Sequence, residues 1–139
     1  MDILIVSQYF WPENFRINDL AIALDEEGHK VTVLTGLPNY PEGNIFKGYK
    51  WKVKKEVYKN INIIRVPIVA RGRSSNVRLF LNYFSFAVIA TILSPFLVKG
   101  NIDKIFIYGA SPLTKAIPAI LLKKIKKAPI FLWVLDLWP

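Results

Sequence analysis

A carboxylate, an amide and a guanidinium group stand close together near the start of the sequence, at Glu13, Asn14 and Arg16. Arginine meets phosphate oxygens through a planar fork of donors. Asparagine can donate to and accept from sugar hydroxyl groups, and a carboxylate can accept from a hydroxyl group or help remove its proton. Polar groups beside aromatic rings suit sugars, whose C–H faces are apolar, and the same segment contains Tyr9, Phe10, Trp11 and Phe15. We therefore predict that residues 8–16 contact a ligand.

Each of these side chains also has a purely structural alternative. Trp11 and Phe15 are equally consistent with local packing over the end of a sheet. Asn14 is also suited to the N-cap of a helix, and Glu13 to a solvated position beside that helix start. Our candidates for ligand contact in this segment are Pro12, Glu13, Asn14 and Arg16, and Glu13 is also a candidate catalytic base.

Further candidate residues follow two later apolar runs. Gly109 and Ser111 belong to a short loop after residues 102–108, and we predict that both contact the ligand. Asp136 follows residues 129–135 and is a candidate catalytic carboxylate; its structural alternative is helix capping. These loops converge with residues 8–16 if all the strands before them are parallel, because parallel strands end at one edge of the sheet.

The periodicity of the first 35 residues predicts the elements that position this site. Residues 2–7 are an Ile- and Val-rich run typical of a strand buried on both faces. From Ile17 the apolar residues follow a helical spacing until Gly28, and residues 30–35 form a second β-branched run. Such a strand–helix–strand unit is right-handed and pairs its strands in parallel. Residues 8–16 therefore open at the ligand edge of the sheet.

The rest of the chain continues this alternation. Residues 36–43 are a long loop, and residues 51–67 form a lysine-rich, two-stranded excursion, although residues 61–66 are also suited to the main sheet. Residues 102–108 and 129–135 are predicted strands, with a helix between them that Pro118 kinks or delays. We predict an α/β fold: one domain with a mainly parallel sheet and helices on both faces.

The uncharged apolar block at residues 79–98 has three interpretations. It is suited to a core helix packed on the sheet, to a helix whose outer side enters a membrane interface, or, least well, to a membrane span. Polar residues interrupt the block, and Pro95 should end or kink its helix. Arg71, Arg73 and Arg78 precede it and suit anionic head groups, so we predict that these arginines lie near a membrane.

Composition excludes several function classes. The 139 residues contain no cysteine, which removes disulfides, thiolate nucleophiles and cysteine-ligated zinc, and the lone His29 argues against a histidine-based metal site. The net charge is +9, but the sequence contains no recognised motif for reading nucleic acid, which argues against a nucleic-acid partner. No glycine occurs between Met1 and Asp25, so the glycine-rich turn for dinucleotide cofactors is missing. No signal peptide is visible, and we expect a cytoplasmic protein.

Several short motifs carry a resemblance to a known family. They are YFWPE at 9–13, GHKVTV at 28–33, PNYP at 38–41, GASP at 109–112 and DLWP at 136–139. With them the chain resembles the N-terminal domain of a GT-B fold glycosyltransferase of the family 4 type. It is most similar to the bacterial O-antigen, capsule and colanic-acid group that includes fucosamine transferases. The resemblance spans essentially the whole chain.

The resemblance implies a Rossmann-like α/β/α sandwich that binds the acceptor, with a separate C-terminal domain for the sugar nucleotide. The sequence would then be a truncated enzyme, inactive alone, with no cofactor bound to this domain. The full enzyme would retain the anomeric configuration without a metal. Its acceptor would be a saccharide on undecaprenyl diphosphate, at the inner face of the cytoplasmic membrane.

The sequence departs from the family pattern at two places. Many relatives have a glycine pair where this chain has residues 11–13, and many have a histidine where Asp136 stands. His29 lies in a helix-to-strand turn, and we interpret it as structural. The alternative function is a non-catalytic module with a half-Rossmann scaffold that associates with a membrane or binds a ligand.

Overall fold

The fold is built on one six-stranded sheet, seen in a computed structural model that describes residues 1–73, 75–109, 114 and 116–134. The strand order is β3-β4-β2-β1-β5-β6, and every neighbouring pair is parallel except β3 with β4. The four predicted core strands are confirmed, with ends that differ by one or two residues. The strands are β1 (Asp2–Val6), β2 (Lys30–Gly36), β3 (Lys54–Tyr58), β4 (Ile61–Val66), β5 (Lys104–Gly109) and β6 (Ile130–Val134).

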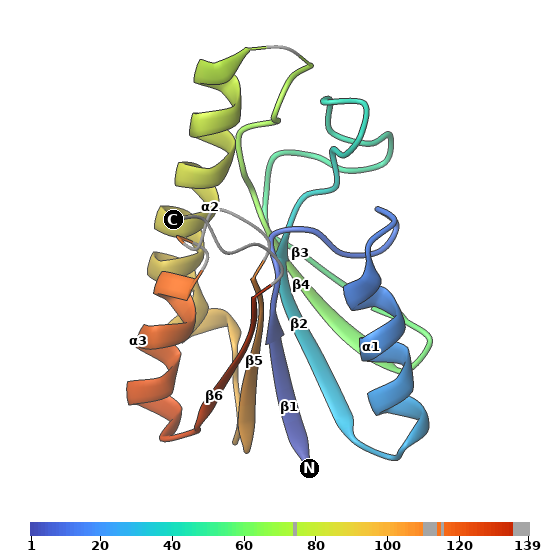
Figure 1. Ribbon diagram of the computed structural model, residues 1–139, viewed down its shortest axis with the longest axis vertical. Helices are drawn as coiled ribbons and strands as arrows, with labels where there is room; N and C mark the ends of the chain where they lie inside the picture. Colours follow the sequence, from blue (N-terminus) through green and yellow to red (C-terminus); the bar gives the residue numbers. More distant parts are fainter. Residues whose placement is uncertain (74, 110–113, 115, 135–139) are drawn as a thin grey trace.

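Helices cover both faces of the sheet, which confirms the predicted α/β/α layers. Helix α1 (Arg16–Glu26) lies on one face, and α2 (Asn76–Leu97) and α3 (Ala116–Lys126) lie together on the other (Figure 1). Strand β1 supplies both cores: Ile3 and Ile5 pack on the α1 side, and Leu4 and Val6 on the α2 side. A central parallel strand is apolar at nearly every position because both of its faces are buried.

Residues 51–67 form the predicted excursion, and its second strand joins the main sheet. Strand β4 pairs in parallel with β2, while β3 pairs antiparallel with β4 at the edge. Strand β3 alternates between half-buried and exposed residues, and its lysines Lys54 and Lys55 blunt the free edge.

Helix α1 begins without the side-chain cap that Asn14 was predicted to provide as one alternative. Phe15 is the N-cap residue and its side chain makes no capping hydrogen bond, so that alternative is wrong. Asn18 ties the helix start to the loop instead. Its amide Nδ2 donates to the carbonyl of Glu13 (2.7 Å), and its Oδ1 accepts from the N–H of Trp11 (3.0 Å).

Helix α2 buries polar side chains together with the apolar Phe86 on its inner side and exposes a series of large apolar side chains on its outer side. Asn82, Ser85 and Ser94 are buried, whereas the exposed large side chains are Val77, Phe80, Leu81, Phe84, Val88, Ile92 and Phe96. Among the described residues α2 alone is long and apolar enough to cross a membrane, and 33% of its most apolar window is buried. Only one side of this helix therefore packs in the core.

Pro95 and Pro118, which were expected to interrupt the predicted helices, both lie near helix ends. Only two helical residues follow Pro95 in α2, and Pro118 lies in the first turn of α3 as described from Ala116. A first-turn proline lacks only an N–H that has no partner within the helix.

Candidate functional site at the strand ends

The loops that follow the parallel strands gather at one edge of the sheet, at the top of Figure 1. Residues 7–15 follow β1, residues 37–53 follow β2, and residues 67–73 follow β4. The carboxyl ends of parallel strands form the ligand edge of an open α/β sheet. The predicted site in residues 8–16 therefore lies where the fold would bind a ligand.

Three aromatic rings and an arginine from these loops form a strand-end cluster, which we define as Tyr9, Phe15, Tyr40 and Arg71. The rings of Tyr9 and Phe15 stack with centroids 4.8 Å apart, and the Tyr40 ring lies 4.9 Å from that of Phe15. The guanidinium carbon of Arg71 lies 4.9 Å from the centroid of the Tyr40 ring. Phe15, Tyr40 and Arg71 are half-buried.

Glu13 lies beneath this cluster and joins two loops. Its carboxylate accepts backbone N–H groups from Phe10 (3.2 Å), Asn39 (2.9 Å) and Tyr40 (2.9 Å). The side chain is buried, so the solvated position that was one alternative for it is wrong. Burial raises the pKa of Glu13 to about 7, although the three N–H donors favour the charged form and oppose the rise.

Asn39 continues this chain of hydrogen bonds to Arg71. The Oδ1 atom of Asn39 accepts the backbone N–H of Arg71 (3.0 Å), and its Nδ2 donates to the carbonyl of Leu37 (3.0 Å). We predicted that Arg71 lies near a membrane, together with Arg73 and Arg78. The structure places its guanidinium in the strand-end cluster, a position for which the sequence showed no local signal.

Helix α2 contacts the same cluster through its buried Asn82. Its Oδ1 accepts from Gln8 Nε2 (2.6 Å) and from the Tyr9 hydroxyl (3.2 Å), and its Nδ2 donates to the carbonyl of Val69 (2.7 Å). The Tyr9 hydroxyl in turn accepts from Nη1 of Arg71 (2.9 Å). Burial raises the pKa of Tyr9, so this hydroxyl stays protonated.

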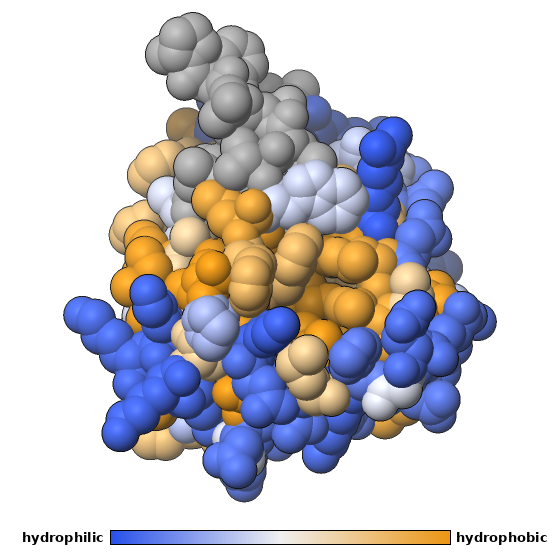
Figure 2. Space-filling model, turned by 60° about the horizontal axis from the view of Figure 1, so that its bottom comes forward, coloured by the Kyte–Doolittle hydropathy of each residue, from blue (hydrophilic) through white to orange (hydrophobic). Residues whose placement is uncertain are grey.

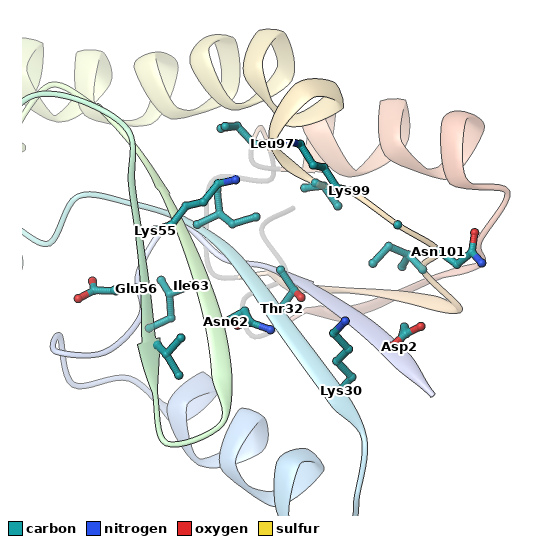
Figure 3. A pocket seen from close by; sticks show the side chains of 15 residues that line it. Asp2, Lys30, Thr32, Lys55, Glu56, Asn62, Ile63, Leu97, Lys99 and Asn101 are labelled. Atoms are coloured by element: carbon teal, nitrogen blue, oxygen red, sulfur yellow. The ribbon is translucent and has the colours of Figure 1, made fainter.

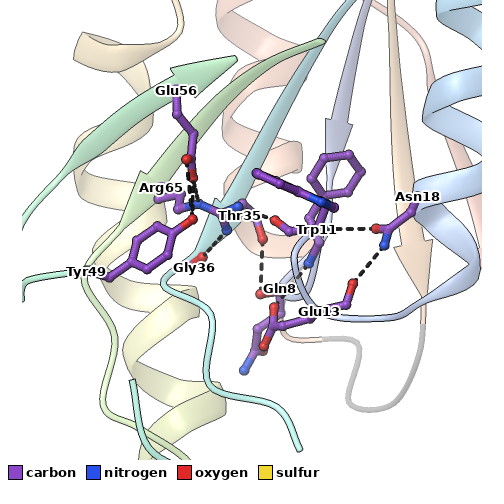
Figure 4. A network of polar contacts seen from close by, with 10 residues as sticks. Gln8, Trp11, Glu13, Asn18, Thr35, Gly36, Tyr49, Glu56 and Arg65 are labelled. Atoms are coloured by element: carbon purple, nitrogen blue, oxygen red, sulfur yellow. Dashed lines mark hydrogen bonds and ion pairs between the residues drawn. The ribbon is translucent and has the colours of Figure 1, made fainter. Parts of the chain in front are cut away.

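A second network, around Arg65 of β4, supports the first loop from the sheet (Figure 4). This fully buried guanidinium donates to Glu56, to the carbonyl of Gly36 (3.1 Å) and to the carbonyl of Trp11. The Trp11 ring stacks on Tyr58 of β3 with centroids 4.1 Å apart. Trp11 therefore packs locally, which was its structural alternative.

The remaining predicted residues occupy different positions around this edge. Pro12 is half-buried, Asn14 and Arg16 are exposed, and Gly109 ends β5. The positive charge of Arg16 opposes the rise that burial causes in the pKa of Tyr108, which precedes Gly109. Ser111 and Asp136 lie outside the described residues.

Two hollows lie away from this edge. One, of about 370 Å³, lies at the amino ends of the strands, with side chains of Lys30, Lys55 and Lys99 around it (Figure 3). The other, of about 320 Å³, lies between α1 and strands β1, β5 and β6 and is mostly apolar. Figure 2 shows a face on which apolar side chains gather in the centre, with hydrophilic side chains mainly below and to the right of them.

The strand-end cluster can bind a sugar against its rings and an anion against its arginine. Over the part of the chain that the structure describes, no three His, Cys, Asp or Glu side chains come together to hold a metal.

Solved structures with this architecture are sugar-transferring enzymes. An α,α-trehalose-phosphate synthase from Burkholderia xenovorans, solved with glucose-6-phosphate, matches with a TM-score of 0.60 and 14% identity, over 99% of this chain and 34% of its own. The chain has the fold of one Rossmann-like domain of a GT-B glycosyltransferase. The Burkholderia multivorans enzyme matches with a TM-score of 0.57 and 14% identity, over 99% of this chain and 34% of its own.

A third structure, the trehalose-6-phosphate protein of E. coli bound with UDP-2-fluoro glucose, has a TM-score of 0.59 and 13% identity over 100% of this chain and 34% of its own. This GT-B chain thus spans about a third of the length of the structures it matches. No protein-family model matches the sequence, and no curated protein matches it. Membership of family 4 and of the O-antigen group stays a prediction.

Proposed function

We propose that this chain is the acceptor-binding half of a retaining glycosyltransferase. The observation that carries the proposal is the strand-end cluster at the ligand edge of a GT-B fold, where rings and an arginine lie side by side. A second, sugar-nucleotide domain would face this edge and supply the donor. Transfer would proceed without a metal, as the resemblance to family 4 glycosyltransferases implies.

The acceptor in this proposal is a saccharide linked through diphosphate to a lipid, used in cell-surface polysaccharide synthesis. The outer side of α2 supports it, because a row of exposed apolar side chains suits a membrane interface. Arg73 and Arg78 are exposed near the start of that helix and suit anionic head groups. The protein would lie on the inner face of the cytoplasmic membrane, within reach of such a lipid.

The test is sugar transfer by the enzyme in which this chain is joined to its sugar-nucleotide domain. Membranes containing lipid diphosphate saccharides, supplied with sugar nucleotides, should yield a lipid saccharide longer by one sugar, with the donor's anomeric configuration. Asn14→Ala and Arg16→Ala should each lower kcat/KM for the acceptor by about tenfold. The exposed neighbour Asp19, changed to Asn, is the control and should stay within about twofold.

Two results would count against the proposal. If kcat/KM for the acceptor stays within about twofold of wild type in Asn14→Ala and Arg16→Ala, residues 8–16 support the fold without contacting the acceptor. Binding to membranes without transfer from any sugar nucleotide would favour the alternative, a non-catalytic membrane-associating or ligand-binding module.

A further inference from the structure

Arg71 is held in place from its backbone to its guanidinium. Its N–H donates to Asn39 Oδ1 (3.0 Å), and Asn39 is fixed in turn by the buried carboxylate of Glu13. Its Nη1 donates to the Tyr9 hydroxyl (2.9 Å), and its guanidinium lies over the Tyr40 ring. A long side chain that is already ordered loses little entropy when a ligand binds, so this arginine is prepared for a contact.

The charge of Arg71 has no carboxylate partner among the described residues. The ion pairs recorded there join Arg65 to Glu56 and Arg73 to Glu42. The recorded side-chain hydrogen bond of Arg71 uses one of the five N–H donors of a guanidinium, and its acceptor is a neutral hydroxyl. A half-buried cation is screened less than an exposed one, so it attracts an anion at this edge.

We propose that Arg71 binds the phosphate or diphosphate ester of a ligand at the strand ends, with the adjoining sugar against the rings of Tyr40 and Phe15. This deepens the proposed function, because it assigns the acceptor's diphosphate to a named arginine. Guanidinium meets phosphate oxygens with two parallel hydrogen bonds, which lysine cannot reproduce. Glu13 and Asn39 act as positioning residues, since they hold the loop from which Arg71 extends.

The experiment is a calorimetric titration of the 139-residue chain with inorganic pyrophosphate. Wild type should bind at one saturable site, and Arg71→Gln should weaken binding by about tenfold or more. Lys47→Gln is the matched control, because it removes one positive charge from an exposed side chain in the loop that follows β2, at the same edge of the sheet. Its dissociation constant should stay within about twofold of wild type. Absence of binding by wild type, or equal binding by Arg71→Gln, overturns the proposal.

Arg71→Lys covers the case in which Arg71→Gln does not fold. It keeps the charge and most of the stem but loses the planar fork, so pyrophosphate should bind about threefold more weakly or worse. A dissociation constant within about twofold of wild type would overturn the forked contact. Thermal unfolding of each variant shows whether weaker pyrophosphate binding comes from the lost contact or from a protein that no longer folds.

Binding to two kinds of lipid vesicle shows whether Arg71 contacts the diphosphate of a lipid-linked ligand or the phosphate of membrane head groups. Binding to neutral vesicles that contain undecaprenyl diphosphate should fall in Arg71→Gln, whereas partitioning to phosphatidylglycerol vesicles should match wild type. An equal loss on both would assign Arg71 to membrane head groups and overturn the proposal.

Pyrophosphate binding that depends on Arg71, without any sugar transfer, would refute only the proposed function. Sugar transfer with an unchanged acceptor KM in Arg71→Lys would refute only this inference.

Discussion

Glu13 is a buried carboxylate whose ionisation should make stability depend on pH. Its pKa rises from 4.5 to about 7 on folding, so the folded chain binds the proton more tightly than the unfolded chain. The contribution of Glu13 to stability is therefore fully present below about pH 4.5 and is lost as pH rises to about 7. The rise corresponds to about 3 kcal/mol.

Glu13→Gln isolates this contribution, because glutamine does not titrate. Urea unfolding at several pH values should show the stability difference between wild type and Glu13→Gln shrinking from pH 4.5 to 7.5, by about 1–3 kcal/mol. A constant difference for Glu13→Gln across this range would contradict the assignment.

Arg65 should be costly to remove, because three partners depend on it. Arg65→Met leaves Glu56 without its cation and the carbonyls of Gly36 and Trp11 without a donor. Breaking a buried pair from one side costs about 3–5 kcal/mol of unfolding free energy.

Urea unfolding of Arg65→Met measures that cost. Lys55→Met on β3 is the control; Lys55 is exposed, and its variant should change stability by about 0.5 kcal/mol or less. A loss below about 1 kcal/mol in Arg65→Met would mean that solvent or other groups replace its contacts.

Helix α2 should carry membrane binding on its outer side. Phe80 and Phe84 are exposed, with rings stacked 5.7 Å apart, and each buries apolar area if it enters the interface. The double variant Phe80→Ser and Phe84→Ser should weaken partitioning to anionic vesicles by about tenfold or more. Added salt should weaken wild-type binding, and neutral vesicles should bind poorly.

Sedimentation with vesicles measures this partitioning. Val57→Ser is the matched control, because Val57 is equally exposed but lies on the edge strand β3. Equal partitioning of wild type to anionic and neutral vesicles, or none to either, would remove the membrane role of α2.

As a whole, the isolated chain should not transfer sugar. Catalysis needs donor and acceptor held together in one geometry, and this chain spans about a third of the solved enzymes that share its fold. Purified protein, incubated with sugar nucleotides and lipid diphosphate saccharides, should give no product above a heat-denatured control. Turnover by the purified chain would overturn the division of roles between two domains.

Patterns in the sequence predicted the central strands, helix α1 and the edge of the sheet at which residues 8–16 lie. Runs of Ile and Val predicted the central strands because both faces of a parallel strand are buried, and the period from Ile17 predicted α1. Handedness then placed residues 8–16 at the ligand edge. Each of these inferences uses a pattern within one element or between neighbouring elements.

Which groups meet at that edge depends on contacts between segments that are far apart in the sequence. The Tyr9 hydroxyl lies 62 residues along the chain from Arg71, the Trp11 carbonyl 54 residues from Arg65, and the Glu13 carboxylate 26 residues from Asn39. Local periodicity reports how much of an element is buried, but it does not report which distant loop packs against it. The burial of Glu13 and the position of Arg71 follow from the packing of loops that separate strands bring to one edge.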